Sequence, residues 1–197
     1  MNYLAHLYLS YPNHGLMVGN FIADAVKGYR YRDFPEPIKQ GILMHRSIDD
    51  FTDHHPLVLD SKKYFSKEFD KYSGVLIDIY FDYFLASNFA LYSDISLPAF
   101  AANTYTILTN HKTIFPERSV LFFEYMLKEN ILEQYAELDG IKRVLHGMTH
   151  RIKKLFPLYD SLYTFKDKQE YLYNNFVPFF EELKLHIAHF RHNQPSG

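Results

Sequence analysis

The stretch Ile77-Asp78-Ile79-Tyr80-Phe81-Asp82-Tyr83-Phe84-Leu85 decides the fold class and raises the first question about function. Its apolar residues are of the kind that face a protein core, and in a helix Asp78 and Asp82 would share one face at the i,i+4 spacing. Carboxylates in such surroundings are costly to bury unless they are paired or bound to a metal, and two like charges at this spacing repel. The stretch therefore predicts a core helix whose two acids bind a cation.

The same spacing occurs about thirty residues earlier, in His45-Arg46-Ser47-Ile48-Asp49-Asp50. In a helix, His45 and Asp49 would lie on one face with their Cβ atoms about 5–6 Å apart. A solvated face, with Arg46 paired to a neighbouring acid, is the alternative interpretation. We predict a metal-dependent active site whose ligands are drawn from one set of side chains, His45, Asp49, Asp78, Asp24, Asp82 and His6.

Asp24 and His6 join this set on weaker grounds. Asp24 lies near the end of a helix expected over residues 15–27, which stops at Gly28. An acid at the negative end of a helix dipole needs positive compensation, either from Lys27 or from a bound cation. His6 alone is more typical of a hydrogen-bonded core or surface histidine. Other histidines at helical spacing lack carboxylates on the same face and are expected on the surface or behind the ligands: His146, His150, His186 and His189.

Composition limits the kind of protein and the kind of metal. A chain of 197 residues is most simply one domain, here residues 1–192, with a frayed tail over 193–197. It has no cysteine, which excludes disulfides, thiolate metal sites and a cysteine nucleophile, so His and carboxylate ligands favour Mn, Fe, Zn or Mg. The net charge of −2 gives no global attraction to nucleic acid or to an anionic membrane. With no signal peptide or membrane span recognised, a cytoplasmic protein is the default expectation.

Helical periodicity dominates the chain, and no segment alternates at period two over the length of a strand. The fold class is therefore predicted to be all-α, a single-domain helical bundle. Pro178 is expected to kink or break the last helix. One further helix is expected to start at Pro35 and Pro37 and to end before Pro56. Separate helices are expected over residues 73–92, 98–111, 117–130, 141–156 and 167–189.

Among catalytic patterns, only metal-assisted hydrolysis finds support. The chain has no Gly-rich phosphate loop and no Gly-x-Ser-x-Gly elbow. Hydrolysis by a metal-activated water needs His and Asp ligands, open coordination positions and a cation that binds phosphate. Arg46, beside His45, is the candidate for that cation, and a salt bridge to Asp49, Asp50 or Asp53 is the alternative. The predicted catalytic residues are Arg46, Asp49 and Asp24.

Several motifs together resemble one known family: Met1-Asn2-Tyr3-Leu4-Ala5-His6-Leu7, Gly19-Asn20-Phe21-Ile22-Ala23-Asp24, Gly41-Ile42-Leu43-Met44-His45-Arg46-Ser47-Ile48-Asp49, Thr52-Asp53, His55-Pro56 and Asp78 through Leu85, with a weaker echo from Gly147 to Arg151. The family is that of acyl carrier protein phosphodiesterase, also called acyl carrier protein hydrolase. The resemblance implies an all-α fold related to the HD-type phosphohydrolases and a divalent metal, Mn²⁺ being the ion associated with the family and Fe²⁺, Zn²⁺ or Mg²⁺ the alternatives. It also implies removal of the 4′-phosphopantetheine arm from holo-acyl carrier protein. The chain departs from the family in two ways: it has Tyr8 and Tyr83 where members often have His, and it lacks an adjacent His-Asp dipeptide.

An acidic protein substrate requires a basic surface. One candidate segment holds Lys27, Arg30 and Arg32, directly after the Asp24 helix. A second candidate holds Arg143, His146, His150, Arg151, Lys153 and Lys154. A solvated face is the alternative for either segment. Two rival functions also stay open: a helical metal phosphohydrolase acting on a nucleotide or another small phosphodiester, and a noncatalytic helical binding module.

Overall fold

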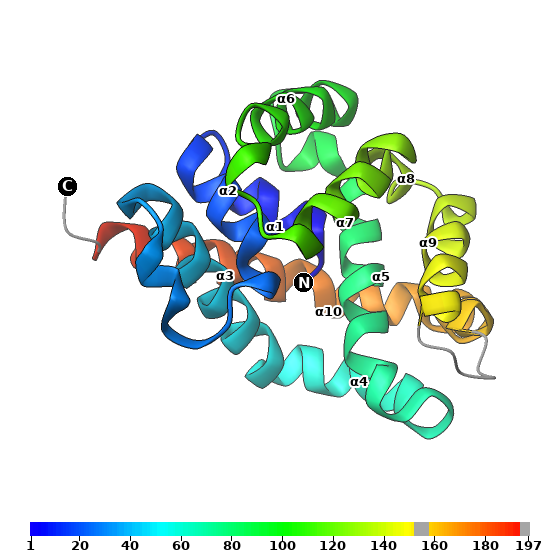
Figure 1. The fold of residues 1–197 in the computed structure, drawn as a ribbon. Helices are drawn as coiled ribbons and strands as arrows, with labels where there is room; N and C mark the ends of the chain where they lie inside the picture. The colour runs from blue at the N-terminus through cyan, green and yellow to red at the C-terminus, as the bar shows by residue number, and fades with distance from the viewer. Residues whose placement is uncertain (152–157, 194–197) are drawn as a thin grey trace.

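The structure is a computed structural model that describes residues 1–151 and 158–193 (Figure 1). Its described residues form helices and turns without a strand, which confirms the all-α prediction. The α-helices are α1 (Tyr3–Ser10), α2 (His14–Ile22), α3 (Glu36–His54), α4 (Pro56–Phe69), α5 (Ser73–Ser87), α6 (Leu97–Asn110), α7 (Glu117–Lys128), α8 (Ile131–Gln134), α9 (Leu138–Arg151) and α10 (Ser161–His192). Within the described ranges, no helix combines the length and the apolar character needed to cross a membrane.

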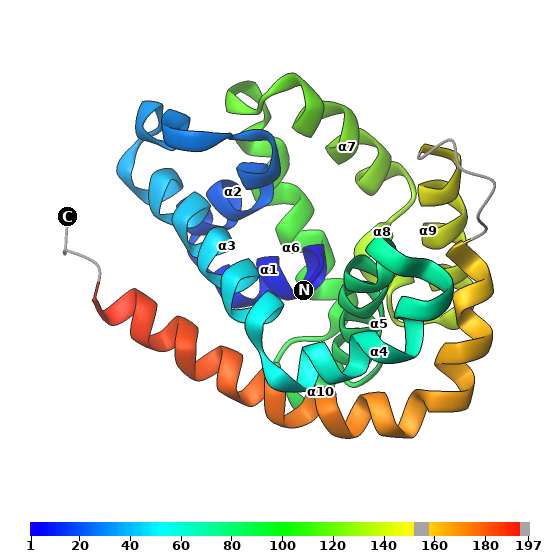
Figure 2. The same cartoon turned by 90° about the horizontal axis from the view of Figure 1, so that it is seen from below.

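Helix α5 is the buried helix that its apolar sequence predicts. The ring of Tyr80 stacks on that of Phe165 of α10, with the two ring centroids 4.1 Å apart. Phe81 packs edge-on against Phe176, also of α10. Figure 2 shows α10 running as one long curved helix beneath α3, α4 and α5. These contacts between rings belong to one connected core that α5 and α10 share.

Helices α2 and α3 approach each other unusually closely because each carries a glycine at the crossing. A Cβ added to Gly41 would lie 2.4 Å from the carbonyl oxygen of Leu16 and 2.8 Å from Cα of Gly19. A Cβ added to Gly19 would lie 2.0 Å from the carbonyl oxygen of Ile38. Only glycine permits this distance between two helix backbones. The crossing therefore fixes the position of α2 relative to the segment of α3 that follows Gly41.

Several predicted helix boundaries are confirmed. Ser96 caps α6, since its Oγ accepts a hydrogen bond from the backbone N–H of Ala99 at 3.4 Å. Helix α3 starts at Glu36 and α7 at Glu117, each directly after a proline. Helix α9 starts at Leu138, three residues before the expected start at residue 141, and its predicted end at residue 156 lies outside the described residues, as does the tail over 194–197.

Other boundaries differ from the prediction. Helix α10 continues through Pro178, so the expected break is wrong, and α5 ends at Ser87 instead of near Tyr92. Helix α2 ends at Ile22 and is followed by a 3-10 turn, η1 (Ala23–Ala25), then by η2 (Gly28–Asp33). Helix α3 ends at His54, so the predicted end before Pro56 is confirmed, but Pro56 also starts α4, a helix that was not predicted, and proline is well tolerated in the first turn.

Candidate metal centre

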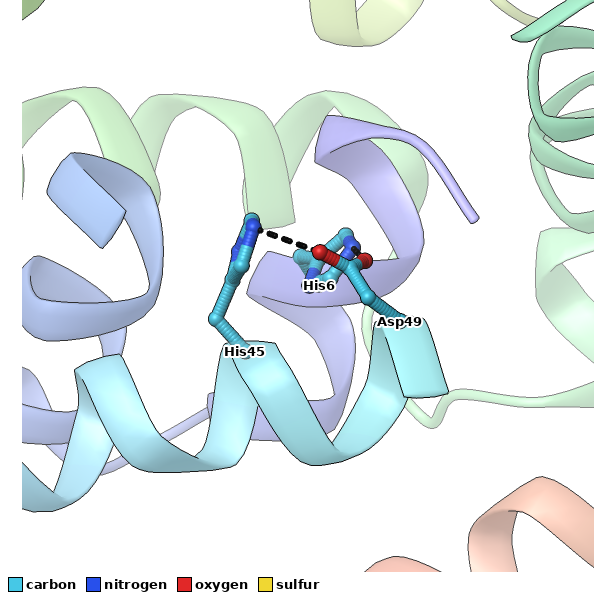
Figure 3. A group of neighbouring side chains, drawn as sticks. All are labelled: His6, His45 and Asp49. Atoms are coloured by element: carbon cyan, nitrogen blue, oxygen red, sulfur yellow. Dashed lines mark ion pairs between the residues drawn. The ribbon is translucent and has the colours of Figure 1, made fainter. Parts of the chain in front are cut away.

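Three side chains from α1 and α3 point toward one another (Figure 3). One nitrogen or oxygen atom from each of His6, His45 and Asp49 lies within 4.8 Å of the others. Nε2 of His6 is 3.2 Å from Oδ1 of Asp49, and Nε2 of His45 is 3.1 Å from Oδ2 of the same carboxylate. The two imidazole rings stack with their centroids 4.2 Å apart. The predicted shared helix face of His45 and Asp49 is confirmed, and α1 brings His6 to it.

The buried side chain of Asn20 orients both imidazoles. Its Oδ1 lies 2.8 Å from Nδ1 of His6 and 2.9 Å from Nδ1 of His45. Its Nδ2 donates to the carbonyl oxygen of His6 at 3.0 Å and to Oγ of Ser10 at 2.7 Å, which fixes the orientation of the amide. Because Oδ1 can only accept, both histidines donate from Nδ1, and both Nε2 atoms face Asp49. This is the arrangement in which neighbouring groups set the tautomer of metal-binding histidines.

Asp24 adds a second carboxylate at the edge of the cluster. Its Oδ1 lies 3.4 Å from Nε2 of His45, and its Oδ2 accepts a hydrogen bond from the hydroxyl of Tyr3 at 3.4 Å. The carboxylate leaves η1 with 60% of its side chain exposed. The predicted compensation of this acid thus comes from His45. The carboxylate of Asp24 therefore contacts the cluster through His45 and is also accessible to solvent.

The charges in the cluster are strongly coupled. Burial and the neighbouring charge of His45 lower the pKa of His6 to about 4. Burial also acts to lower the pKa of His45, but hydrogen bonds with Asp24 and Asp49 outweigh it and raise that pKa to about 9. Against the effect of burial, the two histidines hold the pKa of Asp49 well below its usual range. At neutral pH the cluster therefore contains one imidazolium, one neutral imidazole and carboxylates, so a cation is stabilised at this position.

The cluster lies on the wall of a cavity of about 970 Å³. The polar part of its lining comes from α1, α3 and η1 and includes His6, His45 and Asp49. The other side is largely apolar and comes mostly from α7, α8 and α9. The side chains on that side are Leu121, Phe122, Tyr125, Ile131, Val144 and Met148. The cavity is therefore large enough for a substrate far bigger than a phosphate group, and its two sides differ in chemistry.

Asp78 and Asp82 do not join the ligand cluster. Asp82 is fully buried, and its carboxylate accepts backbone N–H groups at the start of α1: Asn2 at 3.2 Å, Leu4 at 2.8 Å and Ala5 at 3.4 Å. Oδ1 of Asp78 lies 2.9 Å from the amino nitrogen of Met1, and its side chain lines the cavity. The expectation that both i,i+4 pairs form one ligand set is therefore wrong. Asp82 caps α1, and the repulsion within the pair is relieved by these N–H groups and by the amino group.

Arg46 also has different partners from those expected. One guanidinium nitrogen, Nη2, donates to the carbonyl oxygens of Val26 and Gly28, each at 2.9 Å. The guanidinium lies over the ring of Tyr31, 5.1 Å from the ring centroid. These contacts fasten the η1–η2 segment to α3, and Arg46 is not among the residues that line the cavity in the described part of the chain. They contradict both the predicted phosphate contact and the alternative salt bridge to a neighbouring Asp.

The two basic segments differ in exposure. Lys27, directly before η2, and Arg30 and Arg32 on η2 are exposed and close in sequence to Asp24 at the cavity. In the second segment, Arg143 donates from Nε to Oε1 of Gln134 at 3.2 Å, and His146 packs near the ring of Tyr159. The side chains of His150 and Arg151 and all of Lys153 and Lys154 lie outside the described residues. None of these three cations lines the cavity, so a docking role for the first segment stays a prediction that rests on its exposure and its closeness in sequence to Asp24.

Sequence reasoning overlooked two residues at this site. Asn20 is four residues before Asp24, the same spacing as His45 and Asp49, and this signal could have identified it. Arg118, which lines the cavity from α7, has no comparable signal. The residues Tyr8 and Tyr83, which depart from the family, do not touch the cluster: the Tyr8 hydroxyl donates to the carbonyl oxygen of Tyr92 at 2.6 Å, and Tyr83 packs edge-on against Phe165.

The donor set suits a divalent transition metal. Two imidazole Nε2 atoms and one carboxylate converge, and Asp24 offers a further oxygen at the edge. Nitrogen and oxygen donors without thiolate fit Mn²⁺, Fe²⁺ or Zn²⁺. Two features of this structure match such an ion. Oδ1 of Asn20 accepts from both histidines and directs their Nε2 atoms to one point, and the raised pKa of His45 shows that positive charge is stabilised there.

Comparison with known proteins agrees with the motifs. The family model of acyl carrier protein phosphodiesterase matches residues 1–183. The acyl carrier protein phosphodiesterase of Yersinia pestis is 34% identical over 190 residues, which cover 96% of this chain and 98% of the relative. The protein of the same name from Yersinia enterocolitica is 35% identical over 181 residues, covering 91% and 94% of the two chains.

A third relative with this name, from Enterobacter sp. (strain 638), is 34% identical over 186 residues, covering 94% of this chain and 96% of the relative. No solved structure matches the chain. A relation to the HD-type phosphohydrolases thus stays a prediction. The match of one family model and of these relatives over almost the whole length shows that the chain belongs to the acyl carrier protein phosphodiesterase family.

Proposed function

We propose that this chain is a metal-dependent phosphodiesterase that releases 4′-phosphopantetheine from the serine of holo-acyl carrier protein. The observation that carries the proposal is the cluster of His6, His45 and Asp49, oriented by Asn20, on the wall of a large cavity in a member of this family. The relatives are named for the same activity. The two-sided cavity supports a substrate that brings both a phosphodiester and a longer arm.

His6, His45 and Asp49 would hold the ion, Mn²⁺ in this proposal, with Asp24 as a further oxygen ligand or as a base. A divalent ion supplies a Lewis acid for the phosphoryl oxygens and lowers the pKa of water. Asn20 keeps both Nε2 atoms directed at the ion site. Asp24, exposed at the cavity and held by Tyr3, can accept the proton of the attacking water. Water adds across the bond between phosphorus and the serine oxygen, so the serine regains a hydroxyl and the phosphate leaves on 4′-phosphopantetheine.

The exposed cations Lys27, Arg30 and Arg32 support recognition of a protein substrate. Acyl carrier proteins are acidic around the modified serine, as the family resemblance implies. These cations follow Asp24 closely along the chain, so an acidic protein bound to η2 would place its modified serine near the cavity.

The test is a cleavage assay with holo-acyl carrier protein, with release of the arm followed by mass spectrometry. We expect protein that has been treated with a chelator to be inactive and Mn²⁺ to restore cleavage. His45→Ala and Asp49→Ala should lose activity and Mn²⁺ content while keeping the helical circular dichroism signal, because each removes a ligand and little core volume. His54→Ala is the matched control, since His54 is an exposed histidine on the same helix.

Three results would contradict the proposal. Cleavage by protein that contains no metal would reject the metal mechanism. Cleavage of small phosphodiesters with holo-acyl carrier protein left intact would favour the alternative phosphohydrolase. Metal binding without cleavage of either substrate would favour a noncatalytic binding module.

A further inference from the structure

The cavity has an uneven distribution of charge. Its described wall includes the carboxylates of Asp24, Asp49, Asp53 and Asp78, and Arg118 is the only Lys or Arg side chain on it. A phosphodiester is an anion, so these acids repel it unless positive charge compensates. The proposed metal supplies part of that charge. Oxygens of the phosphoryl group that do not contact a metal still need a donor. The amino group of Met1 is paired with Asp78 and both histidines belong to the proposed metal site, so Arg118 is the basic side chain of the described wall that remains for them.

Arg46 cannot take this role without giving up its present contacts. Its Nη2 donates to the carbonyl oxygens of Val26 and Gly28, and its guanidinium packs on Tyr31. Arg118, in contrast, is exposed and makes no ion pair with any residue that the structure describes. Its five N–H donors are therefore open to a ligand.

A chain of contacts connects Arg118 to the metal cluster. Arg118 and Phe122 are four residues apart on α7, so they share a face of that helix. The ring of Phe122 stacks on that of Tyr3 with the centroids 4.4 Å apart. The hydroxyl of Tyr3 lies 3.4 Å from Asp24, which in turn lies 3.4 Å from Nε2 of His45. Arg118 thus lies one helical turn from Phe122, which packs on Tyr3, and Tyr3 contacts Asp24 at the edge of the cluster.

From this placement we infer that Arg118 binds the non-esterified phosphoryl oxygens of the substrate, an inference that rests on the proposed phosphodiesterase function. A guanidinium is planar and can bind two oxygens of one phosphate group, which a lysine ammonium cannot do with the same geometry. Arg118 would hold the phosphoryl group from α7, while His6, His45 and Asp49, which come from α1 and α3 and line the same cavity, would hold the metal. Arg118 would thus bind the phosphate group, as the sequence analysis predicted for Arg46, which lies about seventy residues earlier in the chain.

The test compares Arg118→Ala and Arg118→Lys with Lys128→Ala in the Mn²⁺-loaded protein. Lys128 is an exposed cation on the same helix and does not line the cavity. We expect Arg118→Ala to weaken binding of inorganic phosphate, measured by calorimetry, about tenfold or more. It should also lower kcat/KM about 100-fold or more, and equally, for holo-acyl carrier protein and for bis(4-nitrophenyl) phosphate. Arg118→Lys should retain part of each, and Lys128→Ala all of it.

The possible results separate this inference from the proposed function. A loss confined to holo-acyl carrier protein would make Arg118 a docking residue and overturn the inference. Unchanged phosphate binding and unchanged cleavage in both Arg118 variants would also overturn it. If the wild type cleaved only the small diester, the proposed substrate would be wrong, whereas weaker phosphate binding by Arg118→Ala would still support the phosphate contact. Arg118 is exposed, so circular dichroism should stay unchanged, and Arg118→Lys provides the test if the Ala variant does not fold.

Discussion

Gly19 of α2 and Gly41 of α3 meet backbone to backbone, and a Cβ on Gly41 would lie 2.8 Å from Cα of its partner. Asn20 follows the first glycine, and His45 follows the second by one helical turn. The distance between the two helices therefore determines whether Asn20 can reach both imidazoles. The packing of the fold and the geometry of the site depend on the same contact.

The first prediction concerns that crossing. Gly41→Ala should lower the free energy of unfolding by about 2 kcal/mol or more, because the added methyl group meets backbone atoms that cannot move aside. It should also weaken Mn²⁺ binding, since α2 and Asn20 must shift away from His45. Urea unfolding and calorimetry measure the two effects. Gly74→Ala is the control: its Cβ would meet only the end of the Lys62 side chain at 3.6 Å, so stability should stay the same or rise. Equal destabilisation by both substitutions would refute the prediction.

A second prediction tests the orienting role of Asn20. Asn20→Ala should reduce Mn²⁺ affinity about 10- to 100-fold, because both histidines lose the acceptor that fixes their Nδ1–H tautomer. Metal titration by calorimetry measures the change. Asn175→Ala is the matched control, since Asn175 is also a buried asparagine and hydrogen bonds to Ser61 at 3.1 Å, far from the cluster in sequence. The control should lose stability and keep its metal affinity; a similar loss of affinity in both variants would point to a general effect on folding.

The third prediction is a dependence of metal binding on pH. His45 has a pKa of about 9 in the metal-free protein, so at neutral pH a metal must displace its proton, whereas His6, with a pKa of about 4, is already neutral. Apparent Mn²⁺ affinity should thus rise about tenfold per pH unit between about pH 6 and 8, with one proton released per ion. Calorimetry in buffers of different ionisation enthalpy counts that proton. Release of two protons, or of none, would contradict these charge states.

The raised pKa of His45 also affects stability without metal. A group whose pKa is raised by folding contributes stability that is fully present below its unfolded pKa of about 6.5. This contribution is lost as the pH rises through about 9, the pKa in the folded protein. Chelator-treated protein should therefore lose stability over this interval, and His45→Ala should lose less.

The fourth prediction separates Asp82 from the metal ligands. Asp82→Ala should cost about 3 kcal/mol of stability, because the N–H groups of Asn2, Leu4 and Ala5 are left without an acceptor in the interior. Asp82→Asn keeps an acceptor oxygen and should cost less. Thermal unfolding in the presence of chelator measures both without a contribution from metal. A normal melting temperature with abolished metal binding would restore Asp82 to the ligand set.

The fifth prediction concerns the basic surface on η2. Charge reversal at Lys27, Arg30 and Arg32 should raise the apparent KM for holo-acyl carrier protein and leave turnover at saturating substrate nearly unchanged, since no proposed ligand is altered. Cleavage of bis(4-nitrophenyl) phosphate should not change. Reversal at Lys63, Lys67 and Lys166 is the control, because these lysines are exposed and do not line the cavity. A loss on both substrates would place the η2 cations in the chemistry or in the fold.

Local patterns in the sequence were sufficient to predict the helical class and to pair two of the three cluster residues, His45 and Asp49. The spacing of His45 and Asp49 acts within one helix, so no tertiary information was needed to place them on one face. Asp78 and Asp82 have the same spacing and a different role, because their partners come from the start of α1, almost eighty residues away. A pair of charges in an apolar helix indicates that a partner exists, but tertiary packing decides whether that partner is a metal or a helix N-terminus.

Prolines indicated the starts of α3, α6 and α7 correctly, but Pro56 and Pro178 have surroundings that the sequence did not reveal. Helix α3 ends before Pro56 as predicted, but the sequence did not reveal that the side chain of His55 caps a new helix there by accepting from the N–H of Leu57. Pro178 lies inside α10 between Phe176 and Phe179, both fully buried. Burial of these rings stabilises the helix on either side by more than the lost hydrogen bond costs. Arg46 and Arg118 show the same limitation, since only the folded chain determines which arginine faces the cavity.

The cavity draws its two sides from separate parts of the chain. The cluster and its Asn20 support lie within residues 6–49, while most of the apolar side lies between residues 121 and 148. Substitutions in α7 and α9 can therefore alter which arm or attached group fits without displacing a single ligand. Natural variation or a designed library that is confined to α7 and α9 would therefore change which substrates fit and leave the residues of the proposed metal site unchanged.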